Sequence, residues 1–223
     1  MTALALAPAI AACTPVSPPP LIPMHAGTAP QAEDATTVTV VVGVAGEVLG
    51  GGGWGVALRG ERQVDDGTAL GAQLAIARGD EGDAAVGHAA RHWLVEVRGY
   101  GRLADVERDW LAGLASIGVT TMDTGLVATT LALGGEVSYP NAYAVPALGV
   151  FAAVSHPWRR GRGFGADHDK HVATTWWLGG GAGLLAPIGD SGNAASIELG
   201  VAAAFGQDGG GQVSASIADS HTF

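Results

Sequence analysis

Apolar and polar side chains alternate with a period of two along most of the chain after residue 35. In the segment with the clearest pattern, every second residue from Ile197 to Phe205 is apolar, and the residues between them are small or acidic. This period places successive side chains on opposite faces of an extended strand. Turn signals divide the pattern into about ten predicted strands, at 35–48, 53–63, 68–78, 90–101, 110–118, 124–138, 143–155, 171–185, 194–206 and 211–223.

The alternating runs in these segments are about nine to twelve residues long, which exceeds the usual strand of a soluble protein and suits a tilted strand that crosses a bilayer. The short links at 64–67 and 187–193 fall on one side of the predicted meander, and the two longest, 79–89 and 156–170, fall on the other. Short turns on one side and long loops on the other are typical of outer-membrane barrels. We therefore predict an all-β fold, an antiparallel up-and-down transmembrane β-barrel of eight to ten strands.

One segment also fits a helix. Leu103, Val106, Trp110, Leu114 and Ile117 follow a helical spacing, with charged residues between them. A helix over 103–117 would remove one predicted strand.

A barrel in lipid must close, because lipid offers no hydrogen-bond partner to a free strand edge. Its outward residues are then apolar, and polar residues of the opposite parity face the lumen. The predicted lumen-facing polar residues are Glu47, Arg59, Gln73, Glu96, Arg98, Glu136 and Glu198. Aromatic belts at the two membrane surfaces are suggested by Trp54, Trp93, Tyr100, Tyr139, Tyr143, Trp176 and Trp177.

The composition agrees with a membrane barrel. Only 14% of the 223 residues are charged, 48% are hydrophobic and 36 are glycine, whereas about 25% of residues are charged in ordinary soluble domains. The net charge of −10 argues against a nucleic-acid partner. The single cysteine excludes an internal disulfide and a cysteine-based zinc site.

The first residues have the form of an export signal, an apolar run that ends in small residues before Cys13. The sequence Ile10, Ala11, Ala12, Cys13 resembles the lipobox of bacterial lipoproteins, which implies lipid attachment at Cys13. It departs from that pattern because leucine is usual at the position of Ile10 and no positive charge precedes the run, so an ordinary secretory signal remains the alternative. We predict an export segment at 1–13, a proline-rich linker at 14–34 and a barrel domain at 35–223.

The chain ends on an aromatic residue, Phe223, at the end of an alternating segment. This ending resembles the insertion signal of small bacterial outer-membrane β-barrel proteins. The resemblance implies a bacterial outer-membrane location, with membrane lipid and the barrel-insertion machinery as partners. Asp219 shares the face of Phe223, which departs from the family pattern and is tolerable only near a membrane edge.

Two motifs resemble catalytic or cofactor sites but lack the context that such sites need. Gly50, Gly52 and Gly55 have dinucleotide-binding spacing, but the residues after them predict a strand where that site needs a helix. The segment 189–192 resembles the nucleophile segment of trypsin-like proteases, with Ser191 as nucleophile and with His88 and Asp123 upstream, but Asn193 replaces the next glycine.

Metal-capable side chains also gather in one predicted loop. Asp167, His168, Asp169 and His171 lie there, and His156 lies near its start. Enzymes embedded in outer-membrane barrels place such residues at the barrel rim, but no spacing here selects a partner set. We therefore predict no catalytic, cofactor-binding or metal-binding residue, and no cofactor.

The expected function is that of an outer-membrane barrel with a structural, binding or small-solute porin-like role. A barrel this narrow is largely filled by side chains, so little steady conductance is expected. The alternative is a secreted or lipid-tethered soluble β-domain that binds a surface ligand, and a barrel-rim hydrolase is a third possibility. The sequence does not indicate the ligand.

Overall fold

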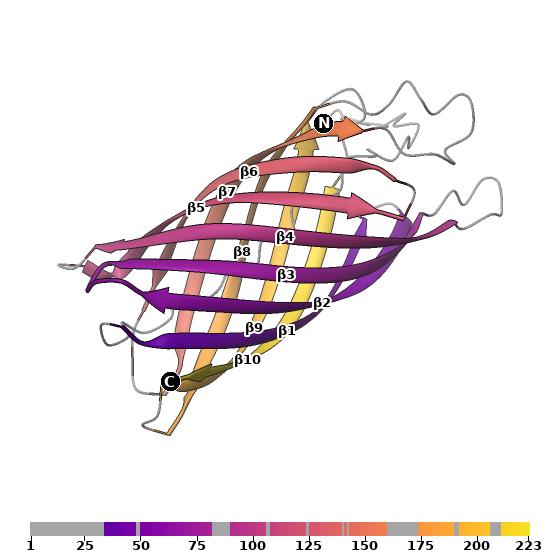
Figure 1. The fold of residues 1–223 in the computed structure, drawn as a ribbon. Helices are drawn as coiled ribbons and strands as arrows, with labels where there is room; N and C mark the ends of the chain where they lie inside the picture. The colour runs from indigo at the N-terminus through magenta and orange to yellow at the C-terminus, as the bar shows by residue number, and fades with distance from the viewer. Residues whose placement is uncertain are drawn as a thin grey trace, which may run out of the picture.

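The computed structural model describes residues 34–47, 50–81, 90–105, 108–123, 125–139, 141, 143–159, 174–189, 192–205 and 211–223. Ten strands account for nearly all of this part of the chain (Figure 1). They are β1 (Thr36–Glu47), β2 (Gly50–Gln63), β3 (Thr68–Glu81), β4 (Ala90–Asp105), β5 (Arg108–Met122), β6 (Val127–Ser138), β7 (Val145–Arg159), β8 (Thr175–Ile188), β9 (Asn193–Phe205) and β10 (Gly211–Thr222). Each strand corresponds to one of the ten predicted segments.

Every strand pairs antiparallel with its neighbours in sequence, and β1 also pairs with β10, so the sheet closes into a barrel. The predicted fold class, an up-and-down antiparallel barrel, is confirmed, with ten strands. The export segment, Cys13 and the linker at 14–34 lie outside the described residues.

The alternative helix over 103–117 is wrong. Leu103 belongs to β4 and Leu114 to β5, and these two strands pair antiparallel along their length. Ile117 is exposed, whereas Leu114 is partly buried on the opposite face of the strand. The helical spacing therefore joins residues from two strands and from both faces of the sheet. The described part of the chain has no apolar helix of membrane-spanning length.

The strands are strongly tilted. Starting at Glu47 and following register partners once around the barrel leads to Ala35, twelve residues away (from position 47 to position 35). For ten strands spaced about 4.8 Å apart with a rise of about 3.3 Å per residue, this offset gives a tilt of about 40° and a wall radius of about 10 Å. A row of register partners therefore climbs from one end of the barrel to the other.

The up-and-down order places the connections at 64–67, 106–107, 139–144 and 189–192 at one end of the barrel, together with Phe223. We call this the Phe223 end. The two longest connections, after β3 and after β7, both lie at the opposite end, as predicted.

The turn between β2 and β3 is held by Asp65. Its carboxylate accepts hydrogen bonds from the backbone N–H groups of Gly67 (2.9 Å) and Thr68 (2.7 Å). These bonds favour the ionised carboxylate and lower the pKa of Asp65 below its ordinary value. The tight link predicted at 64–67 therefore has a local cause in the sequence.

Candidate functional site

The outer surface of the barrel is apolar on every strand. Large hydrophobic side chains are exposed on this outer face and do not point into the lumen. Leu133 reaches 69% and Val150 reaches 67% of full exposure. Apolar surface on this scale marks contact with a membrane or another protein. One such residue from each strand is Val40, Val56, Leu74, Val97, Ile117, Leu131, Leu148, Leu178, Ile197 and Ile217.

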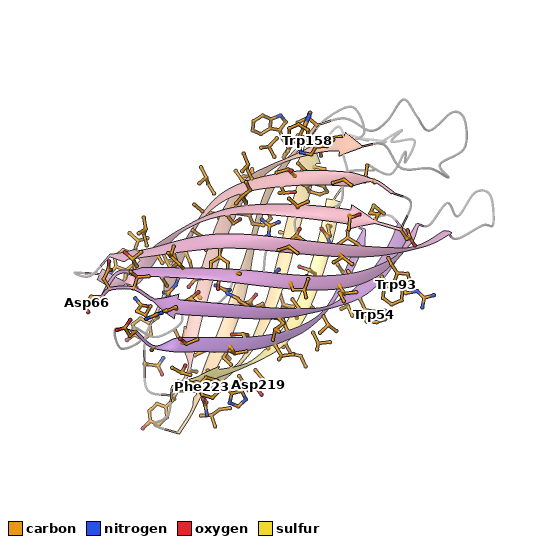
Figure 2. The ribbon with its side chains drawn as sticks, in the orientation of Figure 1. Trp54, Asp66, Trp93, Trp158, Asp219 and Phe223 are labelled. Atoms are coloured by element: carbon orange, nitrogen blue, oxygen red, sulfur yellow. The ribbon has the colours of Figure 1, made fainter. Side chains whose placement is uncertain are left out.

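Aromatic side chains mark one edge of this apolar surface, at the end opposite Phe223. Trp54 and Trp93 pack edge to face with ring centroids 5.9 Å apart, and the Arg78 guanidinium lies 5.4 Å from the Trp93 ring. Trp158 donates its indole N–H to the Thr129 hydroxyl at 2.7 Å. Figure 2 shows Trp54, Trp93 and Trp158 well away from Phe223.

Tyr139 and Phe223, which are 71% and 81% exposed, mark the other edge. Ten residue steps separate Thr129, in strand β6, from Tyr139, the residue directly after the end of that strand. At about 3.3 Å per residue and a tilt of about 40°, this is a height of about 25 Å, which equals that of the apolar band of outer-membrane barrels.

Two aromatic residues suggested for the belts lie elsewhere. Tyr100 and Trp177 are 8% and 5% exposed and share the parity of the inward residues of their strands. Tyr100 packs on a lumen arginine, and Trp177 belongs to a buried apolar cluster, so neither can contact lipid.

Asp219 is the acidic residue of β10 that faces outward. It lies at 3.1 Å from the His221 Nε2, and both side chains are more than half exposed. Figure 2 shows Asp219 beside Phe223 at the same edge of the barrel. A charge costs little near the interface, so this position is compatible with an apolar band above it.

Inside the barrel, one row of register partners is mostly polar and buried. The row crosses eight consecutive strand pairs, and most of its members carry hydroxyl, amide or guanidinium groups. We call it the polar row, and it consists of Ser220, Thr39, Arg59, Gln73, Arg98, Gly118, Thr130, Ser155 and Thr175. Neighbours along it form hydrogen bonds, at 2.9 Å between Thr39 and Ser220 and 3.2 Å between Thr130 and Ser155.

Arg98 is held in a dense ionic cluster within this row. Its Nε donates to Glu96 Oε1 at 2.8 Å and its second terminal nitrogen donates to Glu96 Oε2 at 3.0 Å. It also donates to the Ser116 hydroxyl at 2.9 Å, while Thr120 donates to Glu96 at 3.1 Å. The side chains of Arg98 and Glu96 are 2% and 0% exposed. This two-point geometry compensates the cost of removing both charges from water.

A second cluster surrounds Glu61, which is not among the predicted lumen residues. Its carboxylate accepts from Arg59 at 2.8 Å and from Arg102 at 3.0 Å. Arg59 also donates to the Tyr100 hydroxyl, and its guanidinium lies 4.1 Å from the centre of that ring. The Tyr100 ring is positioned over Gly71, because a Cβ there would overlap the ring atoms.

Residues missed at the sequence level share one signal. Glu61, Tyr100 and Arg102 each lie two or four residues from Arg59 or Arg98, and therefore face the same side of the strand. The alternation of inward and outward residues could have identified them as lumen residues. It could not have identified which of them contact one another, because these contacts join β2 to β4.

The remaining predicted lumen residues differ in burial. Gln73 and Glu198 are buried at 3% and 7% exposure, and Glu136 is partly exposed. The side chain of Glu47 lies outside the described residues.

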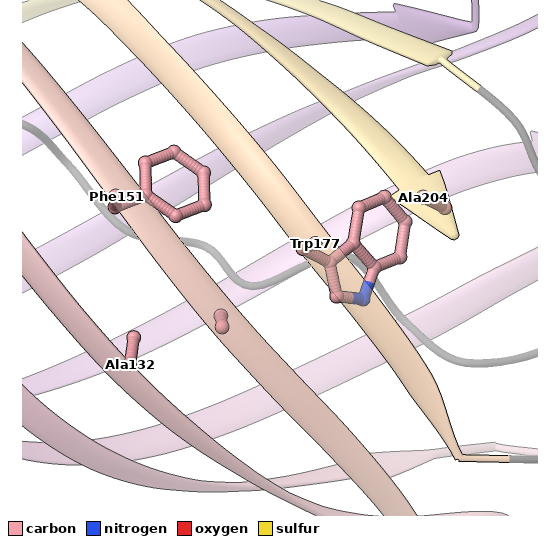
Figure 3. Close-up of a cluster of buried hydrophobic side chains, with 5 residues drawn as sticks. Ala132, Phe151, Trp177 and Ala204 are labelled. Carbon is pink, nitrogen blue, oxygen red and sulfur yellow. The ribbon is translucent and has the colours of Figure 1, made fainter. Parts of the chain in front are cut away.

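A smaller apolar cluster fills part of the lumen beside the polar row. Phe151 and Trp177 project from β7 and β8 toward the interior, with alanines around them (Figure 3). A Cβ on Gly179 would lie 2.5 Å from the Phe151 ring, so the lack of a side chain at position 179 leaves room for this ring against the barrel wall.

The residues considered for chemistry do not form a site in the described part of the chain. His88, Ser191 and the loop residues Asp167, His168, Asp169 and His171 lie outside it. Asp123 accepts a hydrogen bond from the backbone N–H of Trp93, and His156 lies 2.8 Å from the Thr174 hydroxyl. Gly50, Gly52 and Gly55 lie within strand β2, so no helix N-terminus follows them and the dinucleotide alternative is wrong.

No family model and no curated relative matches the sequence. Solved structures do match. The β-domain of the Bordetella autotransporter BrkA is 14% identical, with 86% of this chain and 100% of that chain covered and a TM-score of 0.52. The translocator domain of the autotransporter NalP from Neisseria meningitidis is 12% identical (84% and 88% covered, TM-score 0.47), and a de novo designed transmembrane β-barrel is 15% identical (86% and 98% covered, TM-score 0.34). At these identities the likeness concerns the fold alone: this chain has an outer-membrane-type β-barrel fold.

Proposed function

We propose that this protein is embedded in the bacterial outer membrane as a barrel with a largely filled lumen, and that its role is structural or binding, with passage limited to small solutes. The apolar band between the two aromatic edges carries this proposal. Its height of about 25 Å suits the outer membrane, and in water such a surface would drive aggregation.

The buried clusters support the second part of the proposal. Arg59 projects from β2, and Arg98 and Tyr100 project from β4, into a lumen whose wall radius is about 10 Å. Ion pairs hold the two long arginine side chains in the interior. The part of the lumen beside β2 and β4 therefore has no room for a wide aqueous channel.

Exposure of Phe223 at the end of the last strand supports recognition by the barrel-insertion machinery as part of the same proposal. Its backbone is paired with Thr36 (2.9 and 3.2 Å), while its ring is 81% exposed. Phe223 thus presents an aromatic ring on the outer surface, at the place where the last strand pairs with the first.

Extraction of membranes tests the embedding. We expect the full chain to remain in the membrane fraction after washing with alkaline carbonate, because its apolar band is solvated by lipid. The Cys13→Ala variant, refolded into vesicles, should be retained equally. Release of either form would support the alternative, a soluble β-domain held by a lipid, and would contradict embedding.

A further inference from the structure

Three residues face outward on neighbouring strands at the end opposite Phe223. Trp54 is the register partner of Arg78, and Arg78 is the register partner of Trp93. The two indole rings pack edge to face with centroids 5.9 Å apart, and Figure 2 shows both tryptophans close together at this end of the barrel. The arginine of β3 therefore stands between two tryptophans on the outer surface. We call these three residues the outer triplet.

The outer triplet lies at the border of the apolar band. Two residues closer to the Phe223 end on each strand, the outward side chains are Val56, Ile76 and Val95, which are again register partners. Val56 and Ile76 are 41% and 44% exposed. Tryptophan is enriched at the level of the lipid headgroups. In an embedded barrel, the outer triplet therefore lies where acyl chains give way to phosphate groups.

Arg78 differs from the other arginines whose side chains the structure describes. Each of the others pairs with a carboxylate, Arg59 and Arg102 with Glu61, Arg98 with Glu96, and Arg62 with Asp34. Among the described residues, Arg78 has neither a carboxylate at ion-pair distance nor a hydrogen-bond acceptor, and its guanidinium lies 5.4 Å from the centre of the Trp93 ring. Contact with a ring leaves the N–H groups of a planar guanidinium available to another acceptor.

The acidic residues nearest to Arg78 in the sheet have partners of their own. Asp123 lies two strands from Arg78, about 10 Å at a strand spacing of about 4.8 Å. Its carboxylate accepts a hydrogen bond from the backbone N–H of Trp93 at 3.0 Å. Asp80, two residues after Arg78 on β3, is the register partner of Arg91. The anions that remain for Arg78 at this level are the phosphate groups of lipids.

We propose that Arg78 binds the phosphate group of a membrane lipid, with Trp54 and Trp93 flanking its guanidinium at the edge of the bilayer. This proposal rests on the proposed membrane embedding and names one ligand of the embedded barrel. Guanidinium binds phosphate through two parallel N–H donors. A basic residue at a membrane surface favours an anionic lipid about fivefold.

Quenching of tryptophan fluorescence tests the lipid preference. The folded full chain is placed in phosphatidylcholine vesicles that contain a minor share of a lipid with brominated acyl chains, either phosphatidic acid or phosphatidylcholine. Bromine quenches the indoles that it contacts, so Trp54 and Trp93 report a lipid held at Arg78. We expect phosphatidic acid to be preferred about fivefold, because choline neutralises the phosphate of the other lipid. The Arg78→Gln variant should bind both equally, because it has no charge.

The matched control is Arg62→Gln, which removes another outward arginine from β2. Arg62 lies at the Phe223 end and already pairs with Asp34 at 2.8 Å. This variant should keep the wild-type preference for phosphatidic acid. Loss of the preference in Arg62→Gln would show a general effect of charge and would overturn the assignment to Arg78.

A second comparison separates a lipid from a free anion. Inorganic phosphate in the buffer, compared with chloride at equal ionic strength, should leave the preference unchanged, because acyl chains hold the headgroup at the edge of the bilayer. Displacement by inorganic phosphate would contradict a lipid ligand.

The site and the embedding fail in different ways. Equal quenching by the two brominated lipids in the wild type, or a preference that survives in Arg78→Gln, would overturn the lipid site and leave the embedded barrel intact. Absence of quenching by both lipids would instead contradict the embedding on which the site rests.

Discussion

Replacing Arg98 with alanine is expected to destabilise the barrel by about 3 to 5 kcal/mol, because a carboxylate would lose its ion-pair partner in a buried site. Glu96 is 0% exposed, and its remaining donor among the described contacts would be the Thr120 hydroxyl. The measurement is the free energy of unfolding in guanidinium chloride, followed by tryptophan fluorescence in lipid vesicles.

Two further variants separate the ion pair from general disruption. Arg78→Ala removes an arginine at the aromatic edge, where its contact with Trp93 is a cation–π interaction worth about 0.5 to 1 kcal/mol. The double variant Glu96→Gln, Arg98→Met removes both charges and should recover much of the lost stability. A single Arg98→Ala variant as stable as wild type would show that the cluster does not hold the lumen together.

The second large effect concerns the outer face. Leu133 lies near the middle of the apolar band on β6, and Leu133→Arg is expected to cost about 2 to 4 kcal/mol of stability in vesicles. The same charge in Tyr139→Arg lies at the band edge and should cost at most about 1 kcal/mol. Equal effects of the two substitutions in the same unfolding assay would contradict the position of the membrane.

Alternation predicts the strands because lipid and lumen impose opposite demands on neighbouring residues. Ile197 and Glu198 illustrate this, since one is 51% exposed outward and the other is buried within the barrel. The same rule is enough to assign Arg59 and Arg98 to the lumen from the sequence alone. The closed topology follows from the cost of unpaired peptide groups in lipid.

Contacts across the lumen could not be predicted in this way. The Arg59–Tyr100 contact joins β2 to β4, and it depends on the register of two strand pairs and on the space above Gly71. Alternation could, in contrast, have separated the two adjacent tryptophans of β8. Trp176 faces outward with the exposed Leu178 and Leu184, whereas Trp177 faces inward with small residues, so the two cannot both belong to a belt.

The helical alternative at 103–117 failed for a related reason. A hairpin of two strands can repeat apolar residues at intervals of three and four when outward Leu103 and Ile117 combine with inward Leu114. Only the pairing of β4 with β5 resolves this ambiguity.

Two neighbouring positions on β10 offer the most direct test of a barrel whose apolar face lies in lipid. Ile217 is 61% exposed on the outer face, and Ser216 is partly exposed on the inner face. In a Cys13→Ser background, a bimane label on Ile217→Cys or Ser216→Cys is measured in vesicles of lipid with brominated acyl chains. We predict strong quenching at position 217 and little at position 216. Equal quenching at both positions, or none at position 217, would contradict contact between the outer face and lipid.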